Sequence, residues 1–341
     1  MTAPPKEKIL VTGGAGFIGS ALIRLWLARD GKVSLVNFDK LTYCGDLSRL
    51  DSVRQNGRLE FLKKDVCRPK DVEDALDGCS AVVHLAAETH VDRSLLEAKT
   101  FFDTNLYGTY TLLEAARKKG IKKFLYVSTD EVYGSRDHGV FKEEYAFRPT
   151  SPYSVSKAAA DLLVLSYAKV HGLYTLVTRG ANTFGPFQYP EKMIPLFVSQ
   201  ALENKKLPLY GDGRQTRTWM SVEDHCRAIL TVLEKGKKGE AYNISTSTEL
   251  TNIELTRRIL KILKKPESLI QSVADRVGHD RRYAVSSAKL RKLGWKETSD
   301  FEKALEETVR WYREHRDWWK AIKEKKDDFK KYYALAYAGR S

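Results

Sequence analysis

The chain has 341 residues, which is enough for one large domain or two fused ones. Its 42% hydrophobic and 30% charged residues are typical of a soluble globular protein, and no apolar run reaches the length of a membrane span. The net charge of +14 favours anionic ligands, and either a nucleic acid or a phosphorylated metabolite would satisfy it.

The cysteines Cys44, Cys67, Cys79 and Cys226 show neither a C-x-x-C pair nor a Cys/His ligand spacing. We therefore expect no structural metal site. They favour free thiols in a reducing compartment, and the first residues show no apolar signal region, so we expect a cytoplasmic protein.

A glycine-rich turn follows the first predicted strand, residues 8–12. The spacing Gly13-x-x-Gly16-x-x-Gly19 comes directly after that strand, and a helical pattern continues to Arg29. Glycines at this spacing permit a tight turn, let the backbone approach a pyrophosphate and leave the helix N-terminus facing that anion. With a strand before it and a helix after it, the motif predicts a dinucleotide site.

Asp39 ends the second predicted strand, residues 32–38, twenty residues beyond Gly19. An acid at this distance accepts hydrogen bonds from the adenosine ribose and repels a 2′-phosphate, which favours NAD over NADP. Two alternatives stay open: Asp39 could cap an ordinary turn, and the adjacent Lys40 could tolerate a phosphate.

Strands and helices alternate through the first half of the chain. Further strands are predicted at residues 59–64, 81–87, 123–127 and 174–178, with helices over 100–119 and 153–171. This alternation predicts an α/β fold, a doubly wound, mostly parallel sheet of the Rossmann type. The segments that follow the strands, such as Asp65-Val66 and Glu88 to Asp92, should meet at the carboxyl edge of the sheet, where such folds bind ligands.

The stretch from 128 to 157 carries the acid and base candidates. Thr129, Asp130 and Glu131 follow a buried strand, and Tyr153 and Lys157 are four apart, so that they share a helix face. An ammonium group beside a phenol favours the phenolate and would lower its pKa from about 10. Chance spacing of the Tyr/Lys pair and a solvated turn at the two acids are the alternatives.

Beyond residue 179 the rhythm breaks, which predicts a smaller second lobe. We expect a Rossmann domain over 1–181 with 222–245 returning to it, a substrate lobe over 182–221 and 246–320, and a basic tail over 321–341 that forms a solvated helix end. Within the lobe, residues 207–217 are interpreted as a hairpin. Residues 301–319 are interpreted as one amphipathic helix capped by Ser299 or Asp300.

With these motifs assembled, the chain resembles the extended short-chain dehydrogenases/reductases, and within them the nucleotide-sugar 4,6-dehydratases, most closely those acting on dTDP-glucose. The glycine motif and the Tyr153/Lys157 pair identify only the superfamily. The acid pair of Thr129-Asp130-Glu131 is more specific. Residues 88–94, 189–192 and 278–283 also match the dehydratase pattern.

The resemblance implies an NAD-dependent hydro-lyase mechanism for these residues. Tyr153, tuned by Lys157, would take the proton of the sugar's C4 hydroxyl as hydride leaves C4, with Thr129 bonded to the same oxygen. Glu131 would then remove the C5 proton. Asp130, protonated, would help the C6 hydroxyl leave as water before hydride returns to C6. Two carboxyl groups in opposite protonation states are what this chemistry needs.

The resemblance also assigns binding residues. The NAD site should comprise Gly13, Gly16, Phe17, Ile18, Gly19, Asp39, Lys40, Leu41, Thr42, Asp65, Val66, Leu85, Ala86, Ala87, Thr104, Tyr153 and Lys157. The nucleoside-diphosphate hexose should be faced by Thr89, Thr129, Asn182, Lys192, Met193, Pro208, Leu209, Tyr210, Arg217, Asn252, Asp275 and His279. Family members dimerise through the two long helices, so we expect a homodimer through residues 100–119 and 153–171 and neither a nucleic-acid nor a membrane partner.

Three departures leave the nucleobase open among dTDP, UDP and CDP. Thr218 stands where dehydratases often have Asp, and Ala181 and Thr183 flank Asn182 where Ser and Asn are common. The competing interpretations are a UDP-sugar decarboxylase or 4-epimerase on the same scaffold, and a non-catalytic NAD- or nucleic-acid-binding protein suggested by the positive charge.

Overall fold

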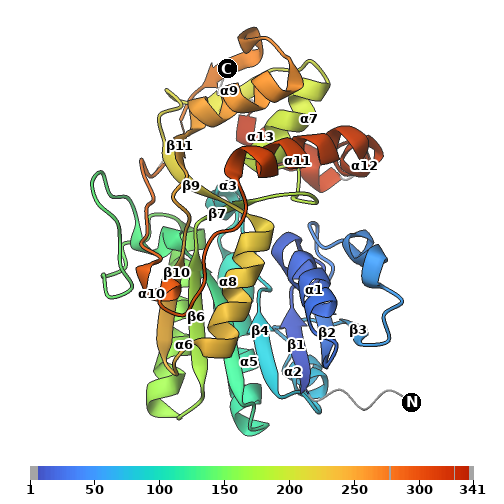
Figure 1. Cartoon of the computed structure of the whole chain (residues 1–341), viewed down its shortest axis with the longest axis vertical. Helices are drawn as coiled ribbons and strands as arrows, with labels where there is room; N and C mark the ends of the chain where they lie inside the picture. The colour runs from blue at the N-terminus through green and yellow to red at the C-terminus, as the bar shows by residue number, and fades with distance from the viewer. Residues whose placement is uncertain (1–6, 276–277, 326, 338–341) are drawn as a thin grey trace.

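The computed structural model describes residues 7–275, 278–325 and 327–337 (Figure 1). Its centre is a parallel seven-stranded sheet in the order β10-β6-β5-β4-β1-β2-β3. The strands are β1 (Glu7–Thr12), β2 (Val33–Asp39), β3 (Leu59–Lys63), β4 (Ala81–His84), β5 (Lys123–Thr129), β6 (Thr175–Gly180) and β10 (Glu240–Ile244). The predicted doubly wound parallel sheet is confirmed.

Helices cover both faces of this sheet. They are α1 (Phe17–Arg29), α2 (Pro69–Ala75), α5 (Gly108–Lys118), α6 (Pro152–Val170), α8 (Val222–Lys235) and α10 (Ala288–Arg291). The short helices α3 (Val91–Leu96) and α4 (Lys99–Phe101) pack against α6. A π-helical turn, Phe102–Tyr107, joins α4 to α5, and short 3-10 helices lie at Leu47–Val53 and Asp130–Tyr133. Helices α1 and α8 contribute to one core cluster, whereas α2, α5 and α6 contribute to the other.

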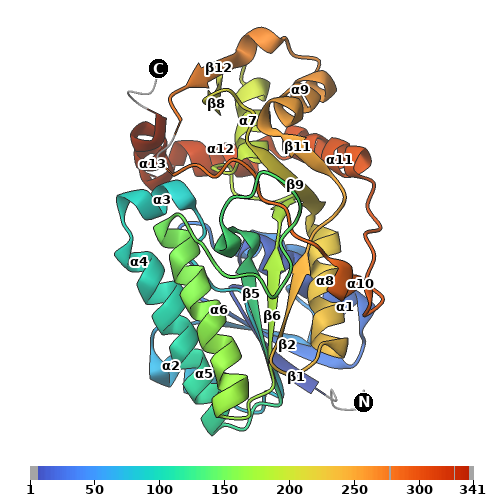
Figure 2. The same cartoon turned by 90° about the vertical axis from the view of Figure 1, so that its left-hand side faces the viewer.

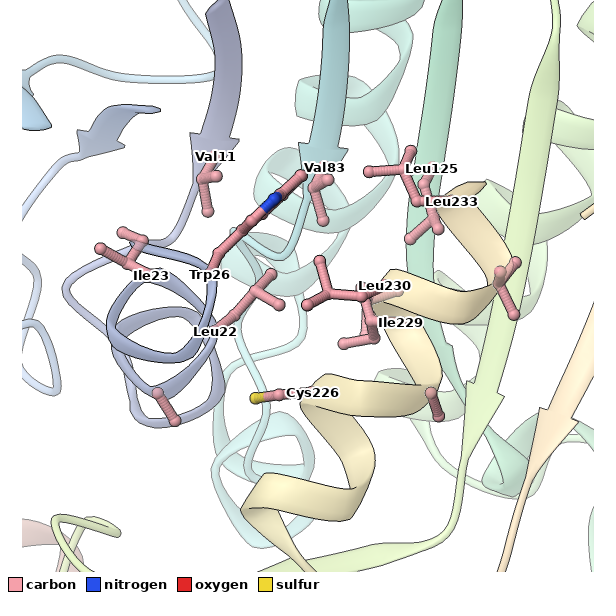
Figure 3. Packing of buried hydrophobic residues seen from close by; sticks show 14 of the residues in the cluster. Val11, Leu22, Ile23, Trp26, Val83, Leu125, Cys226, Ile229, Leu230 and Leu233 are labelled. Atoms are coloured by element: carbon pink, nitrogen blue, oxygen red, sulfur yellow. The ribbon is translucent and has the colours of Figure 1, made fainter. Parts of the chain in front are cut away.

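The face of the sheet that α1 and α8 cover explains why the strand sequences are apolar without interruption. Leu22 and Trp26 of α1 meet Ile229 and Leu230 of α8 over Val83 of β4 (Figure 3). All of these side chains are buried. A strand covered on both faces has no polar side to alternate with, so its residues are apolar throughout.

The chain leaves this sheet after β6 and returns to it with α8 and β10. Strand β10 pairs in parallel with β6, with Tyr242 opposite Thr178. The intervening segment contributes β7 (Asn182–Phe184), α7 (Met193–Leu202), β8 (Leu207–Tyr210) and β9 (Thr216–Ser221) to a second lobe. The division into lobes at 181, 221 and 245 stays a proposal.

The second lobe lies over one end of the sheet (Figure 1). Its remaining elements are β11 (Glu249–Thr251), α9 (Asn252–Leu263), a 3-10 turn at Glu267–Leu269, β12 (Ile270–Val273), α11 (Phe301–Glu314), α12 (Arg316–Lys325) and α13 (Asp327–Tyr337). The hairpin predicted for 207–217 is wrong, because β8 pairs with β12 whereas β9 pairs with β7 and β11. The turn between them is local, but the partners of both strands come from distant segments.

The C-terminal segment also differs from the prediction. The single helix expected over 301–319 is two helices that break at His315, although Asp300 does cap the first, its side chain accepting from the Lys303 N–H. The expected solvated tail packs on the second lobe, where Ile322 and Phe329 are buried. In the sequence, the many lysines of this segment obscure the spacing of its apolar residues. Among the described residues, no helix is long and apolar enough to cross a membrane.

Candidate active site

A cavity of about 360 Å³ opens at the carboxyl ends of the central strands, between the sheet and the second lobe. It is lined by every predicted NAD-site residue except Leu41, namely Gly13, Gly16, Phe17, Ile18, Gly19, Asp39, Lys40, Thr42, Asp65, Val66, Leu85, Ala86, Ala87, Thr104, Tyr153 and Lys157. The same cavity is lined by Thr129, Asp130 and Glu131. Residues from more than a hundred positions apart thus share one cleft.

The glycine turn forms a cradle that side chains would fill. A Cβ atom on Gly19 would lie 2.2 Å from the Gly13 carbonyl oxygen, and one on Gly13, whose φ is +71°, would lie 2.7 Å from the Ala86 nitrogen. The adjacent α1 begins after Gly16 without a side-chain cap. A bare helix N-terminus behind a close backbone turn fits a pyrophosphate, so these residues fit a dinucleotide.

Asp39 and Lys40 at the end of β2 determine whether the cavity favours NAD or NADP. The Asp39 carboxylate accepts from the Ala15 and Leu41 N–H groups at 3.0 and 2.8 Å, which fixes its orientation in the cavity wall. Lys40 forms an ion pair with Asp65 at 2.7 Å. The lysine that could have met a 2′-phosphate is therefore engaged by a carboxylate, and this pairing favours NAD.

Asp130 and Glu131 begin the short 3-10 helix that follows β5, and the Thr129 hydroxyl accepts from the Glu131 N–H. Asp130 is only 3% exposed, and its Oδ2 has no hydrogen-bond partner among the described residues. Burial, together with the charge of Glu131, raises the pKa of Asp130 to about 8. Asp130 is thus protonated at neutral pH, in agreement with its expected role as an acid.

Tyr153 and Lys157 are held by the first turns of α6. The helix begins with Pro152, and Ser151 and Ser154 form a reciprocal capping box that fixes its start. Lys157 is 4% exposed, and its Nζ donates to the Val127 carbonyl oxygen at 2.7 Å and lies 4.2 Å from the Tyr126 ring centre. Burial lowers the pKa of Lys157 to about 7.

The expectation that Lys157 lowers the pKa of Tyr153 is wrong for this structure. Burial and the nearby charge of Glu131 raise the pKa of the Tyr153 phenol well above its usual range, against a smaller opposing hydrogen bond from Thr129. Lys157 itself is desolvated and turned to a backbone carbonyl. The phenol is therefore protonated here, and its ionisation needs additional positive charge in the cavity.

The predicted substrate residues divide into two groups. Thr89, Thr129, Asn182 and Lys192 line the cavity, whereas Met193, Pro208, Leu209, Tyr210, Arg217, Asn252, Asp275 and His279 do not. Arg217 nevertheless acts on the site, because its charge opposes the rise in the pKa of Asp130. Its guanidinium donates to the Asp280 carbonyl oxygen at 2.9 Å and lies over the Tyr283 ring.

Tyr210, Asp275 and His279 lie together in the second lobe, and the Tyr210 hydroxyl also donates to Asp92 Oδ2 of α3 at 3.0 Å. His279 Nδ1 lies 2.6 Å from Asp275 Oδ1, and the Tyr210 ring packs edge-on to the His279 ring. Pro208 and Leu209 are buried in the lobe. Residues 276–277 of the same predicted loop lie outside the described residues.

Several cavity-lining residues were missed from the sequence. Those inside motifs already noted are Glu88, Tyr189 and Glu191, and those outside any motif are Cys44, Arg49, Gln188 and His225. The first group could have been found by treating each motif as a whole. The second group comes from a loop, a lobe turn and α8, and only the tertiary fold brings these segments to the cavity. No cluster of three or more metal-ligating side chains occurs within the described ranges.

Comparison with known proteins identifies the family. Residues 10–308 match the protein family described as GDP-mannose 4,6 dehydratase. The chain belongs to this dehydratase family. The dTDP-glucose 4,6-dehydratase of Streptomyces niveus is 45% identical over 321 residues, covering 93% of this chain and 96% of that protein. The Escherichia coli enzyme of the same name is 42% identical over 348 residues, with coverage of 92% and 96%.

The chain is also similar to solved structures of dehydratases and epimerases. The dTDP-glucose 4,6-dehydratase of Streptomyces venezuelae, solved with NAD and dTDP bound, is 45% identical with a TM-score of 0.91, covering 92% of this chain and 99% of that one. A UDP-glucose 4-epimerase of Thermus thermophilus in complex with NAD is 30% identical with a TM-score of 0.83, with coverage of 90% and 99%. Because epimerases share the fold, the activity of this dehydratase-family chain must be argued from its site.

Proposed function

We propose that this chain is an NAD-dependent hydro-lyase that converts dTDP-glucose into the 4-keto-6-deoxy sugar. The observation that carries the proposal is the pair Asp130 and Glu131, which lie in unlike environments beside Tyr153 in the cavity that contains the glycine cradle. A hexose held between them would meet a protonated acid and a second carboxyl group. The relatives named dTDP-glucose 4,6-dehydratase support the choice of substrate.

The residues fit NAD as the resident cofactor. The glycine cradle would hold its pyrophosphate, Asp39 its adenosine ribose, and Asp65 and Val66 its adenine. When bound in its oxidised form, NAD supplies a hydride acceptor, the donor for the return step, and a positive charge. That charge is what the raised pKa of the buried Tyr153 calls for before the phenol can act as a base.

The chain's own side chains divide the proton transfers between them. With bound NAD as the acceptor of the C4 hydride, Tyr153 would take the proton of the C4 hydroxyl, and the Thr129 hydroxyl would hydrogen-bond to the same oxygen. The resulting 4-keto group acidifies C5, from which Glu131 removes a proton. Asp130, which is protonated at neutral pH, gives its proton to the C6 hydroxyl as the C6–O bond breaks and water leaves.

The wall opposite the glycine cradle would bind the sugar nucleotide. Thr89, Asn182 and Lys192 line the cavity, and Arg217, whose guanidinium donates to the Asp280 carbonyl oxygen, acts on Asp130 through its charge. Half-buried Lys192 donates to the Thr89 carbonyl oxygen, and its amino group suits a diphosphate. Met193, Pro208, Leu209, Tyr210, Asn252, Asp275 and His279 remain candidates for the nucleoside end in the second lobe.

The assembly proposed is a homodimer through the long helices at about 100–119 and 153–171. Tyr107 and Tyr110 on one and Leu162 and Val170 on the other are large, exposed side chains. An apolar stripe on two neighbouring helices is suited to a four-helix bundle with a second copy. The free cysteines among the described residues are compatible with a cytoplasmic enzyme.

The decisive experiment offers dTDP-, UDP-, CDP- and GDP-glucose to the protein in deuterated water. We expect the dTDP sugar to be preferred and its 6-deoxy-4-keto product to carry solvent deuterium at C5, because Glu131 exchanges that proton. UDP-glucuronate is offered in a parallel sample. Release of carbon dioxide from it would indicate a decarboxylase, and C4 inversion without a 6-deoxy product would indicate an epimerase; either result would replace the dehydratase assignment.

A further inference from the structure

The C-terminal helix α13 lies outside the residues that match the family, which end at 308, yet it contacts His90, which follows the cavity-lining Thr89. Figure 2 shows α13 beside α3, although the two helices are far apart in the sequence. On one side Tyr333 accepts from Gln200 Nε2 of α7 at 2.7 Å. On the other side Tyr332 packs edge-on to His90, the N-cap residue of α3, with ring centres 4.8 Å apart. The helix therefore bridges α3 and the second lobe.

Tyr332 takes part in a short relay of hydrogen bonds. Its hydroxyl lies 3.3 Å from both His90 Nε2 and Asp92 Oδ2. The hydroxyl has one proton, and a carboxylate only accepts, so Tyr332 donates to Asp92 and His90 Nε2–H donates to Tyr332. His90 Nδ1 is buried and has no hydrogen-bond partner within the described ranges, which agrees with a neutral ring protonated on Nε2. Burial lowers the pKa of His90 to about 4, so the ring is uncharged at neutral pH.

The Tyr332 ring also packs on a partly buried ion pair between Arg93 and Glu191. The Arg93 guanidinium lies between the rings of Tyr43 and Tyr332, at 4.0 and 4.6 Å from their centres. Its Nε donates to Glu191 Oε2 at 2.8 Å, and Tyr43 donates to the other oxygen of Glu191 at 3.1 Å. A guanidinium stacked on two rings and bonded to a carboxylate has few alternative positions.

These contacts end at the cavity. Lys192 follows Glu191, and its Nζ donates to the carbonyl oxygen of Thr89 at 2.8 Å, which precedes His90. Both Thr89 and Lys192 line the cavity and are proposed to face the substrate. One side chain of α13 thus contacts the segment that carries Thr89 and, through Arg93 and Glu191, the segment that carries Lys192.

We propose that Tyr332 is a positioning residue that fixes Thr89 and Lys192 for the nucleoside-diphosphate sugar, so that the C-terminal helix sets substrate affinity. This inference rests on the proposed function, because it assigns the wall formed by Thr89 and Lys192 to the substrate. The contacts described above join Tyr332 to the NAD site only indirectly, through Arg93 and Tyr43, which follows Thr42. Substrate binding should therefore depend on Tyr332, while cofactor binding should not.

The test compares Tyr332→Phe, which keeps the ring over Arg93 and removes the relay hydroxyl, with Tyr333→Phe as the matched control on the same helix. Calorimetry with dTDP and with NAD, and steady-state kinetics with dTDP-glucose, give the readouts. For Tyr332→Phe we expect the Kd for dTDP and the KM to rise about tenfold, as for loss of a hydrogen bond to a charged group, with kcat and the NAD Kd within about twofold of wild type. Tyr333→Phe should leave all four values near wild type.

A second variant approaches the relay from its other end. His90→Leu removes the donor to Tyr332 and should reproduce the rise in KM, whereas His90→Gln keeps an N–H donor and should restore most of the affinity. Equal values for Tyr332→Phe and Tyr333→Phe, or a fall in kcat without a change in dTDP affinity, would overturn the positioning role. A wild-type protein that neither binds dTDP nor converts dTDP-glucose would overturn the proposed function and this inference with it.

Discussion

Asp130 and Glu131 are adjacent in the chain, yet the carboxyl group of Asp130 is buried with one oxygen lacking a hydrogen-bond partner among the described residues, whereas Glu131 is half-buried in the cavity wall. The short 3-10 helix that contains both residues turns successive side chains in different directions. Burial and the charge of Glu131 therefore act on Asp130, and this asymmetry makes one of two neighbouring acids a proton donor.

The first prediction is a dependence of stability on pH through Asp130. The pKa of its carboxyl is about 8 in the folded state, against 3.8 for an ordinary Asp, so between these pH values the folded state holds a proton that the unfolded state has released. The free energy of unfolding should thus fall as pH rises, with this group contributing up to about 1.4 kcal/mol per pH unit. Asp130→Asn should remove this contribution in urea titrations between about pH 5 and 8. Glu131→Gln should narrow this pH range, because it removes the charge that adds to the effect of burial on Asp130. Identical slopes for wild type and Asp130→Asn would contradict the burial argument.

The second prediction separates the two proton abstractions. Glu131→Gln should slow water loss by roughly 10²- to 10⁴-fold while leaving oxidation at C4 measurable, so that reduced cofactor accumulates in a single turnover. Tyr153→Phe should suppress that accumulation by a similar factor, because it removes the base for the first step. Stopped-flow absorbance of the bound cofactor distinguishes them. Equal suppression of both steps in both variants would show that the two residues act as one unit.

A third prediction concerns the glycine cradle. Gly19→Ala places a Cβ atom 2.2 Å from the Gly13 carbonyl oxygen, and backbone cannot yield as a flexible side chain can. We expect a loss of about 1–3 kcal/mol in unfolding free energy and at least ~10-fold weaker NAD binding by calorimetry. Gly31→Ala is the matched control, since nothing lies within 4 Å of a Cβ there. Unchanged NAD affinity in Gly19→Ala would remove this turn from the cofactor site.

The fourth prediction tests the proposed homodimer. Leu162 on α6 is 58% exposed, so Leu162→Glu should leave the folded subunit intact and place an unpaired charge in the proposed interface. The dimer dissociation constant should rise at least ~10-fold, measured by light scattering across a dilution series. Val140→Glu, at a side chain 41% exposed on another segment, is the control. If the mass of both variants matches wild type at every concentration, the dimer is not formed through these helices.

Much of the site can be predicted from local spacing in the sequence. Gly13 to Gly19, Asp39, and the Tyr153/Lys157 pair are each set by one strand end or one helix face, so their positions in the cavity follow from short-range geometry. The electrostatics of Tyr153 did not follow, because the direction of its pKa shift depends on burial and on Glu131 rather than on helical spacing. His225 of α8 also lines the cavity, but no sequence motif identifies it as a site residue.

Long-range pairing limited the rest of the prediction. Strands β8 and β9 look like a hairpin because a Gly-rich turn joins them, but their partners lie in β12, β7 and β11. The tail was interpreted as solvated because its lysines outweigh its apolar stripe. Only the packed lobe shows that Phe329 and Tyr332 are buried. These outcomes depend on which surfaces meet, and sequence periodicity does not contain that information.

The return of the chain to the sheet through α8 and β10 has a consequence for synthesis on the ribosome. The face that α8 covers, against Leu22 and Trp26 of α1, stays open to solvent until residues 222–244 have been translated. A nascent chain that ends near residue 181 would contain nearly all of the cofactor motifs and would still expose this apolar face to solvent. Chaperone capture of stalled chains should therefore be strongest just before α8 emerges and decline once it docks.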